Sequence, residues 1–224
     1  MQLPDDVTAA ELDKDTRAHL LSLSRDRAEL VARLLVMAGR LIDEDPEGAY
    51  QYAAAAQQLA ARIAVVREAA GVTAYRAGHY AEAIAALRAA RRMSGSDDLI
   101  AILADCERGL GRPERALALM ADPAVARLDR AGRIETLIVA AGARRDLGQD
   151  DAAVLALQVP ELRSNARAGW VARLRFAYAD ALAAVGRHDE ARVWFERAAQ
   201  ADVDGETDAQ ERLDFYDGVE FFEE

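Results

Sequence analysis

Glycine recurs at a nearly constant interval through most of this sequence, and this spacing restricts the fold more than any other feature. Four glycines follow one another at steps of 33, 37 and 38 residues, and each is followed five residues later by an alanine. They are Gly78, Gly111, Gly148 and Gly186. Glycine accepts the positive φ at which a helix stops, and alanine lets two helix backbones approach closely. The interval therefore predicts repeated pairs of helices joined by tight turns.

The segments between these turns have a helical pattern. Apolar residues recur three and four positions apart from Asp26 to Gln200, and no stretch alternates as a strand does. About one-fifth of the residues are alanine, which favours helix. Glu44 lies 34 residues before Gly78, one interval earlier. Pro46, which follows it, would begin a helix. We therefore expect five helical pairs, over residues 30–63, 64–97, 97–133, 134–171 and 172–205, with longer loops around 123–133 and 159–169.

The second and fifth pairs have the most complete pattern. The second reads REAAGVTAYRAGHYAEAIAALRAARRM from Arg67 to Met93, with Gly71, Tyr80 and Leu87 around the turn glycine. In the fifth pair the matching positions are Ala179, Gly186, Ala191, Phe195 and Ala198.

This pattern resembles the tetratricopeptide repeat, a helix-turn-helix unit of about 34 residues. The resemblance covers about 175 of the 224 residues, although no pair has the family's tryptophan near its start or the proline at its end. It implies an all-α fold, an α-solenoid of about five repeats stacked in a right-handed superhelix. Among such proteins the chain is similar to small, uncharacterised tetratricopeptide repeat proteins of actinobacteria, which fits its 27 arginines against one lysine.

The two ends of the chain differ from the repeats between them. Thr8 and Glu11 have the spacing of a capping box, and Leu12, Leu20 and Leu23 would continue a helix that covers the first pair. We interpret residues 1–29 as an N-terminal arm and capping helix, 30–205 as the solenoid, and 206–224 as an acidic, aromatic tail. The alternative for the first segment is a partly disordered arm.

The formal charge of −11 is concentrated at the ends. Residues 202–224 have a net charge of −9 and residues 1–16 a net charge of −4, which leaves about +2 for the part between them. An acidic chain argues against broad binding to a nucleic acid backbone, which requires a clustered basic surface. Charges interrupt every long apolar run, and the N-terminus lacks the pattern of a signal peptide, so we expect a cytoplasmic protein that does not span or bind a membrane.

Few residues indicate catalysis or metal binding. The single cysteine, Cys106, cannot form a disulfide within the chain and is expected to be a small core residue. The three histidines lie too far apart in repeat position to share a metal: His19, His79 and His188.

The motifs of nucleotide-binding enzymes are also missing. The sequence has no phosphate-binding glycine loop, and its one GxG, Gly109 to Gly111, lies in a repeat turn. The acid pairs at 97–98 and 150–151 begin predicted helices, where carboxylates interact favourably with the helix dipole. We expect no enzymatic activity and no cofactor.

The resemblance implies that the first helix of each pair lines a concave groove that binds an extended or helical peptide. The single Lys14 and single Asn165 exclude the lysine and asparagine clamp with which some family members hold a terminal carboxylate. Val31, Leu34 and Ala38 make the first pair apolar at this face, so the N-terminal helix covers them or they form a docking patch. The candidate groove residues are Glu68, Tyr75, Arg76, Asp105, Arg108, Arg145, Arg173, Phe176 and Asp180.

The tail combines acidic and aromatic residues, whereas a merely solubilising tail has few aromatics. Its candidate recognition residues are Phe215, Tyr216, Val219, Phe221 and Phe222. One hypothesis is that the tail docks on the solenoid, with its acids meeting arginines such as Arg108 and Arg145. The other is that it forms a final helix that buries its rings against the fifth pair.

These features favour a protein-interaction scaffold or adaptor whose partner is a protein or peptide. The alternative is a binding chaperone or regulatory sensor in which the acidic tail acts as an autoinhibitory or recognition segment. A further hypothesis is that two copies of the chain associate through these tail residues.

Overall fold

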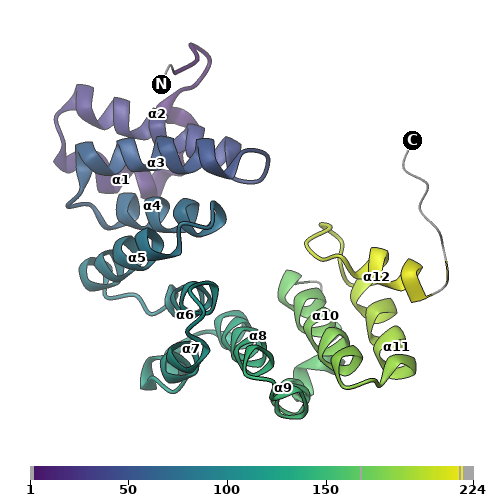
Figure 1. Ribbon diagram of the computed structural model, residues 1–224. Helices are drawn as coiled ribbons and strands as arrows, with labels where there is room; N and C mark the ends of the chain where they lie inside the picture. Colours follow the sequence, from purple (N-terminus) through teal and green to yellow (C-terminus); the bar gives the residue numbers. More distant parts are fainter. Residues whose placement is uncertain (1–2, 167, 217, 219–224) are drawn as a thin grey trace. The chain divides into compact units, whose positions relative to one another are not determined.

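The computed structural model describes residues 3–166, 168–216 and 218, and all regular structure within these ranges is helical (Figure 1). The chain forms two compact units, residues 1–112 and residues 113–224. The prediction of an all-α fold is therefore confirmed. None of the helices in these ranges is long and apolar enough to cross a membrane.

The first unit is a series of helices in which each packs against the next. After the short segments described below, its long helices are α2 (Arg25–Leu41), α3 (Pro46–Ala60), α4 (Ala64–Arg76), α5 (Tyr80–Ser94) and α6 (Ile100–Gly109). Helix α4 also contacts α2 and α6. The first helices of successive pairs therefore lie side by side in this unit.

The second unit repeats this arrangement. Its elements are α7 (Pro113–Met120), η3 (Pro123–Arg127), α8 (Arg130–Asp146), α9 (Asp150–Leu157), η4 (Pro160–Arg163), α10 (Gly169–Ala184), α11 (His188–Ala199) and α12 (Ala209–Tyr216). Consecutive α-helices pack against each other, and α8 also contacts α10. The boundary between the units falls within the third expected pair, with α6 in the first unit and α7 in the second. Each of the two expected long loops contains a short 3₁₀ helix.

The four turn glycines have the predicted conformation. Gly78, Gly111, Gly148 and Gly186 have φ values between 69° and 79°. The next residue in each case donates its backbone N–H to a carbonyl five residues earlier, as His79 does to Ala74 at 2.8 Å and Arg187 to Leu182 at 2.9 Å. This closure satisfies carbonyls that the end of a helix leaves free. The first pair turns without glycine, and its second helix starts at Pro46 as expected.

Small residues occupy the closest helix contacts. A Cβ atom on Gly71 of α4 would lie 2.5 Å from the Leu87 side chain of α5, and one on Gly109 would lie 2.4 Å from the Tyr80 ring. Ala83 and Ala191 are 0% exposed. These contacts confirm that small side chains allow close approach of the paired helices.

The N-terminal helix expected from Thr8 onward is wrong in its extent. Three short elements replace it: η1 (Ala9–Glu11), α1 (Lys14–His19) and η2 (Leu20–Ser22). Leu12 is extended, and the Asp13 carboxylate accepts a hydrogen bond from the Thr16 N–H at 2.8 Å, so a new helix starts there. Asp13 is a strong N-cap residue, and it competes with continuation of the helix.

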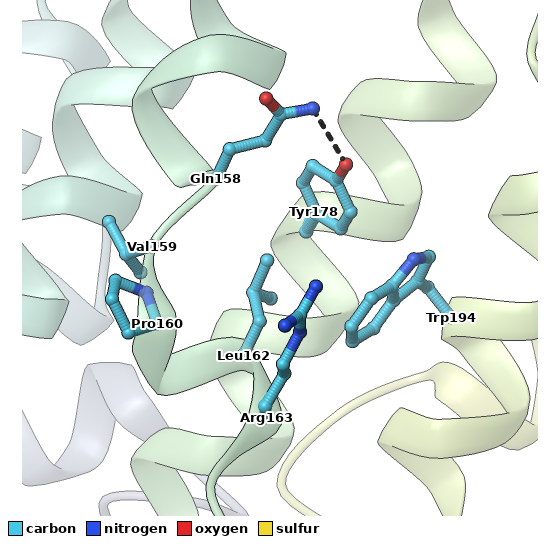
Figure 2. Close-up of a pocket in the computed structure, with 7 residues that line it drawn as sticks. All are labelled: Gln158, Val159, Pro160, Leu162, Arg163, Tyr178 and Trp194. Carbon is cyan, nitrogen blue, oxygen red and sulfur yellow. Dashed lines mark hydrogen bonds between the residues drawn. The ribbon is translucent and has the colours of Figure 1, made fainter.

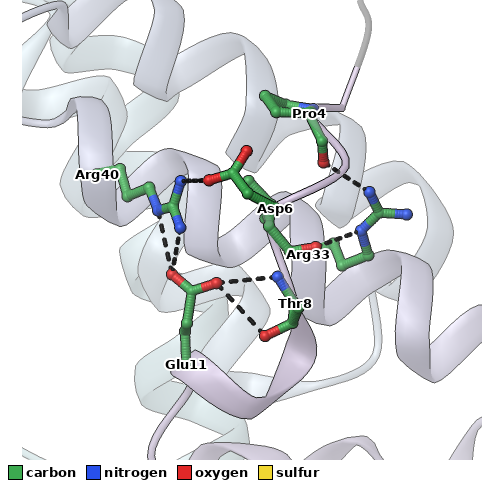
Figure 3. Close-up of polar contacts among 7 residues, drawn as sticks. Pro4, Asp6, Thr8, Glu11, Arg33 and Arg40 are labelled. Atoms are coloured by element: carbon green, nitrogen blue, oxygen red, sulfur yellow. Dashed lines mark hydrogen bonds and ion pairs between the residues drawn. The ribbon is translucent and has the colours of Figure 1, made fainter.

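Two arginines of α2 fix the N-terminal segment (Figure 3). Arg33 donates to the backbone carbonyls of Val7 and Pro4, both at 2.8 Å. Arg40 pairs with Asp6 at 2.8 Å and Glu11 at 2.7 Å. Leu3, Leu12, Leu20 and Leu23 pack beside α2, whose residues Val31, Leu34 and Ala38 are buried. The apolar stripe of the first pair is therefore covered.

Candidate binding faces

Three predicted groove residues meet between α4 and α6 in the first unit. The Tyr75 hydroxyl donates a hydrogen bond to one Asp105 oxygen at 2.5 Å, and Arg108 donates to the other oxygen at 2.7 Å. All three side chains are half-buried. Burial and the neighbouring Asp105 carboxylate raise the pKa of Tyr75 far above its ordinary value, so the hydroxyl stays protonated as a donor.

Glu68 and Arg76 extend the same group along α4 and are both exposed. Arg76 forms an ion pair with Asp43, which follows α2. The pKa of Glu68 is raised because its carboxylate is partly withdrawn from water and lies near Asp98. Five of the predicted residues therefore belong to the first unit, and we call Glu68, Tyr75, Arg76, Asp105 and Arg108 the unit-1 face.

The predicted arginines of the second unit are joined to carboxylates of neighbouring helices. Arg173 of α10 pairs with Glu135 of α8 at 2.7 Å and also with Glu206. Arg145 of α8 pairs with Asp180 of α10, which also accepts from Arg212 of α12 at 3.4 Å. We call these six residues the unit-2 ladder. Its three arginines and three acids balance one another across α8, α10, α12 and the segment before α12.

Phe176, the predicted aromatic point of this part of the groove, belongs mainly to the core. It is half-buried, and its ring lies edge-on to Phe195 of α11 with 5.6 Å between the ring centroids. It packs against the large apolar cluster of the second unit, which includes Trp170, Leu174 and Tyr178.

The described part of the tail is the short helix α12, which packs on α11. The Tyr216 ring lies 5.8 Å from that of Phe195, and its hydroxyl is 3.2 Å from Nδ1 of His188. Leu213 packs against the same apolar cluster, whereas Phe215 is 76% exposed. Val219, Phe221 and Phe222 lie outside the described residues. Over residues 209–216 the tail is thus a final helix of the second unit.

The proposed docking of tail acids on Arg108 and Arg145 meets a physical obstacle. Each of these arginines already has a carboxylate partner on its own unit, Asp105 for Arg108 and Asp180 for Arg145. A tail carboxylate would have to displace a partner that is already held in place. The pairing of Arg145 with Asp180 depends on which helices lie side by side, so the sequence pattern could not reveal it, whereas Arg108 and Asp105 are three residues apart on one helix.

Sequence reasoning missed a cavity of about 460 Å³ in the second unit (Figure 2). It lies between the segment 158–163 and the helices α10 and α11. The Gln158 amide donates to the Tyr178 hydroxyl at 3.0 Å, and the Tyr178 and Trp194 rings meet edge to face with centroids 5.2 Å apart. The sequence indicated only a longer loop in this region. We call this site the Trp194 cavity and define it by Gln158, Val159, Pro160, Leu162, Arg163, Tyr178 and Trp194.

A second cavity, of about 400 Å³, lies between the N-terminal segments and α2. Leucines and alanines line much of it, and Leu21 beside it is 81% exposed. Its charged lining residues are Arg17, Arg25 and Glu29.

The residues considered for catalysis or metal binding have ordinary structural surroundings. His79 pairs with Glu47 at 2.7 Å and stacks near Tyr50. Cys106 is buried, as expected of a core residue, and burial raises the pKa of its thiol to about 12. Within the described ranges, no three histidine, cysteine or acidic side chains are grouped so that they could hold a metal ion.

Comparison of the sequence with models of known protein families gave no match, and comparison with curated proteins gave none either.

Proposed function

We propose that this chain is a tetratricopeptide-like α-solenoid that acts as a non-enzymatic interaction scaffold, holding a peptide or helix of a partner protein. The recurring glycine turns and the tight contacts at Gly71, Ala83 and Ala191 support the repeat assignment. In repeats of this kind each unit contacts its neighbours, and successive first helices form an extended binding surface.

The observation that carries the proposal is the unit-1 face. Its side chains come from two neighbouring first helices, α4 and α6, and the hydrogen bonds of Asp105 hold Tyr75 and Arg108 in place. Groups that are already fixed lose little conformational entropy when a partner binds. A rigid tyrosine ring beside fixed charges is therefore well suited to recognition.

The charges of this face favour a partner segment with a basic residue. Glu68 and Asp98 repel each other, and their proximity raises the pKa of Glu68. A lysine or arginine placed near them would favour the ionised carboxylate. We infer that such a residue of the partner lies opposite Glu68.

The second candidate function is a binding chaperone or regulatory sensor in which the acidic tail is an autoinhibitory or recognition segment. The observation that favours it is the Trp194 cavity, whose lining combines Arg163 with two aromatic rings and so suits an acidic aromatic segment such as the tail. The scaffold function stands first because five predicted groove residues lie on the unit-1 face and three of them are joined by hydrogen bonds.

Charge reversal on the unit-1 face provides the test. We expect Glu68→Arg to weaken capture of the native partner by about tenfold or more, since unpaired or like charges at an interface are costly. The matched control is Glu82→Arg, which makes the same charge change at an exposed position of α5. The measurement is affinity purification of tagged full-length variants from the native cell, with the bound proteins quantified by mass spectrometry.

The two candidates predict different outcomes. A scaffold captures one or a few stoichiometric partners, which the Glu68→Arg variant loses and the Glu82→Arg variant retains. Capture of many unrelated unfolded proteins by the wild type and by both variants would contradict the scaffold function and favour a binding chaperone.

A further inference from the structure

A half-buried arginine of α10, Arg175, joins segments beside the Trp194 cavity. Arg175 donates three hydrogen bonds to backbone carbonyls: to Leu162 at 3.2 Å, to Ser164 at 2.8 Å and to Arg197 at 3.0 Å. These bonds join the segment after α9 to the C-terminal part of α11. The cavity therefore has fixed walls from three separate parts of the second unit.

Positive charge around this cavity is not balanced. Arg163 lines it, and the guanidinium of Arg197 lies 4.6 Å from the centre of the Trp194 ring. Among the described residues, neither of these arginines nor Arg175 forms an ion pair with a carboxylate. Burial and the nearby Arg197 lower the pKa of Arg175, as expected where cations crowd together. In the unit-2 ladder, by contrast, each arginine meets at least one acid.

The lining defines the chemistry of a ligand. The Tyr178 and Trp194 rings offer aromatic surface, and the Gln158 amide offers a polar contact beside them. Arg163 and Arg197 are both exposed, so the N–H groups of both can reach a carboxylate. An aromatic side chain flanked by carboxylates matches both features, because arginine forms strong, directed hydrogen bonds to carboxylates.

We propose that the Trp194 cavity binds an acidic aromatic peptide segment, and that its occupant is residues 217–224 of the same chain. That segment reads DGVEFFEE, with two adjacent phenylalanines between acids. Phe221 or Phe222 enters the cavity against Trp194, and the neighbouring glutamates meet Arg163 and Arg197. The inference uses no residue of the unit-1 face and goes beyond the proposed scaffold function.

The connection is short enough for the chain to bind itself. Helix α12 ends at Tyr216, which packs on Phe195 and His188 of α11. The same helix α11 bears Trp194 and Arg197, so the segment has to pass around one helix, whose diameter is about 10 Å. Eight extended residues reach about 26 Å.

The second cavity, beside α2, fits this ligand less well. Its walls are leucine and alanine side chains without an aromatic ring, and its two arginines, Arg17 and Arg25, are accompanied by the acidic Glu29. The contrast selects the Trp194 cavity as the site.

The test measures binding of a fluorescent synthetic peptide, DGVEFFEE, to full-length variants by fluorescence anisotropy. In the wild type the resident segment competes at a high effective concentration, so the peptide binds weakly. The variant Phe221→Ala with Phe222→Ala leaves the cavity free, and we expect it to bind the peptide about tenfold more tightly. Adding Arg163→Glu and Arg197→Glu to this variant abolishes the gain.

The control for charge is the pair Arg62→Glu and Arg115→Glu, which makes the same change at exposed arginines elsewhere and leaves the gain intact. Circular dichroism melting curves establish that each variant is folded. Equal peptide affinity for the wild type and the double phenylalanine variant would overturn the proposal. Peptide binding that is unchanged by Arg163→Glu and Arg197→Glu would also overturn it. A sedimentation profile in which these two substitutions dissociate a dimer would overturn it as well, because the occupant would then come from a second copy.

Discussion

At the scale of single residues, the smallest side chains have the most restrictive positions. Gly71 and Gly109 lie where an added Cβ atom would overlap Leu87 and Tyr80. The first contact lies within the second pair and the second contact joins the second pair to the third. The glycine interval identified the turn glycines, since positive φ is strained for residues with a side chain.

Enlarging the buried alanines tests the repeat register. We expect Ala83→Leu and Ala191→Leu each to lower the free energy of unfolding by about 1–3 kcal/mol, since both sites are 0% exposed and lack room. The control is the exposed Ala85 of α5, because Ala89 on the same helix is half-buried. Denaturant unfolding curves measure the difference. A loss for Ala85→Leu as large as for Ala83→Leu would show that burial at the helix contact is not the cause.

At the scale of elements, the sequence predicted helices and turns better than their ends and partners. The turns at Gly78 and Gly186 depend on local backbone chemistry, which the sequence contains directly. The break at Asp13 was missed because a capping box at Thr8 and a second cap compete within a few residues. Arg145 and Arg173 are candidate groove residues from the sequence, but their ion pairs with carboxylates of other helices depend on packing. The Trp194 cavity was missed for the same reason, since it combines residues from three segments.

The attachment of the N-terminal segment to α2 gives a prediction at this scale. Arg33→Ala removes two hydrogen bonds to backbone carbonyls, and we expect it to lower the free energy of unfolding by about 1–2 kcal/mol. Arg40→Ala removes only solvent-exposed ion pairs, so its effect is smaller and disappears at high salt. Thermal melting of both variants at low and high salt distinguishes them. A larger, salt-dependent loss for Arg40→Ala would contradict this ranking.

At the scale of the whole molecule, the acidic ends have different structural roles. In the N-terminal segment, Asp6 and Glu11 pair with Arg40 of α2, so part of its charge is used to hold it in place. At the other end, α12 belongs to the second unit through Leu213 and Tyr216, and Arg212 adds an ion pair to Asp180. The sequence left open whether this end is a helix of the fold or a docking segment. Residues 209–216 form a helix of the fold, and we propose that the residues after them are a docking segment.

The central claim is that a partner binds on the unit-1 face, and site-specific photo-cross-linking of the complex tests it most directly. A benzophenone side chain in place of Arg76, which is exposed on α4, would lie on this face, whereas one in place of Ala85 would lie on α5. The account predicts that irradiation of full-length protein with its co-purified partner gives a covalent adduct from position 76 and none from position 85. Adducts from position 85 alone would contradict it.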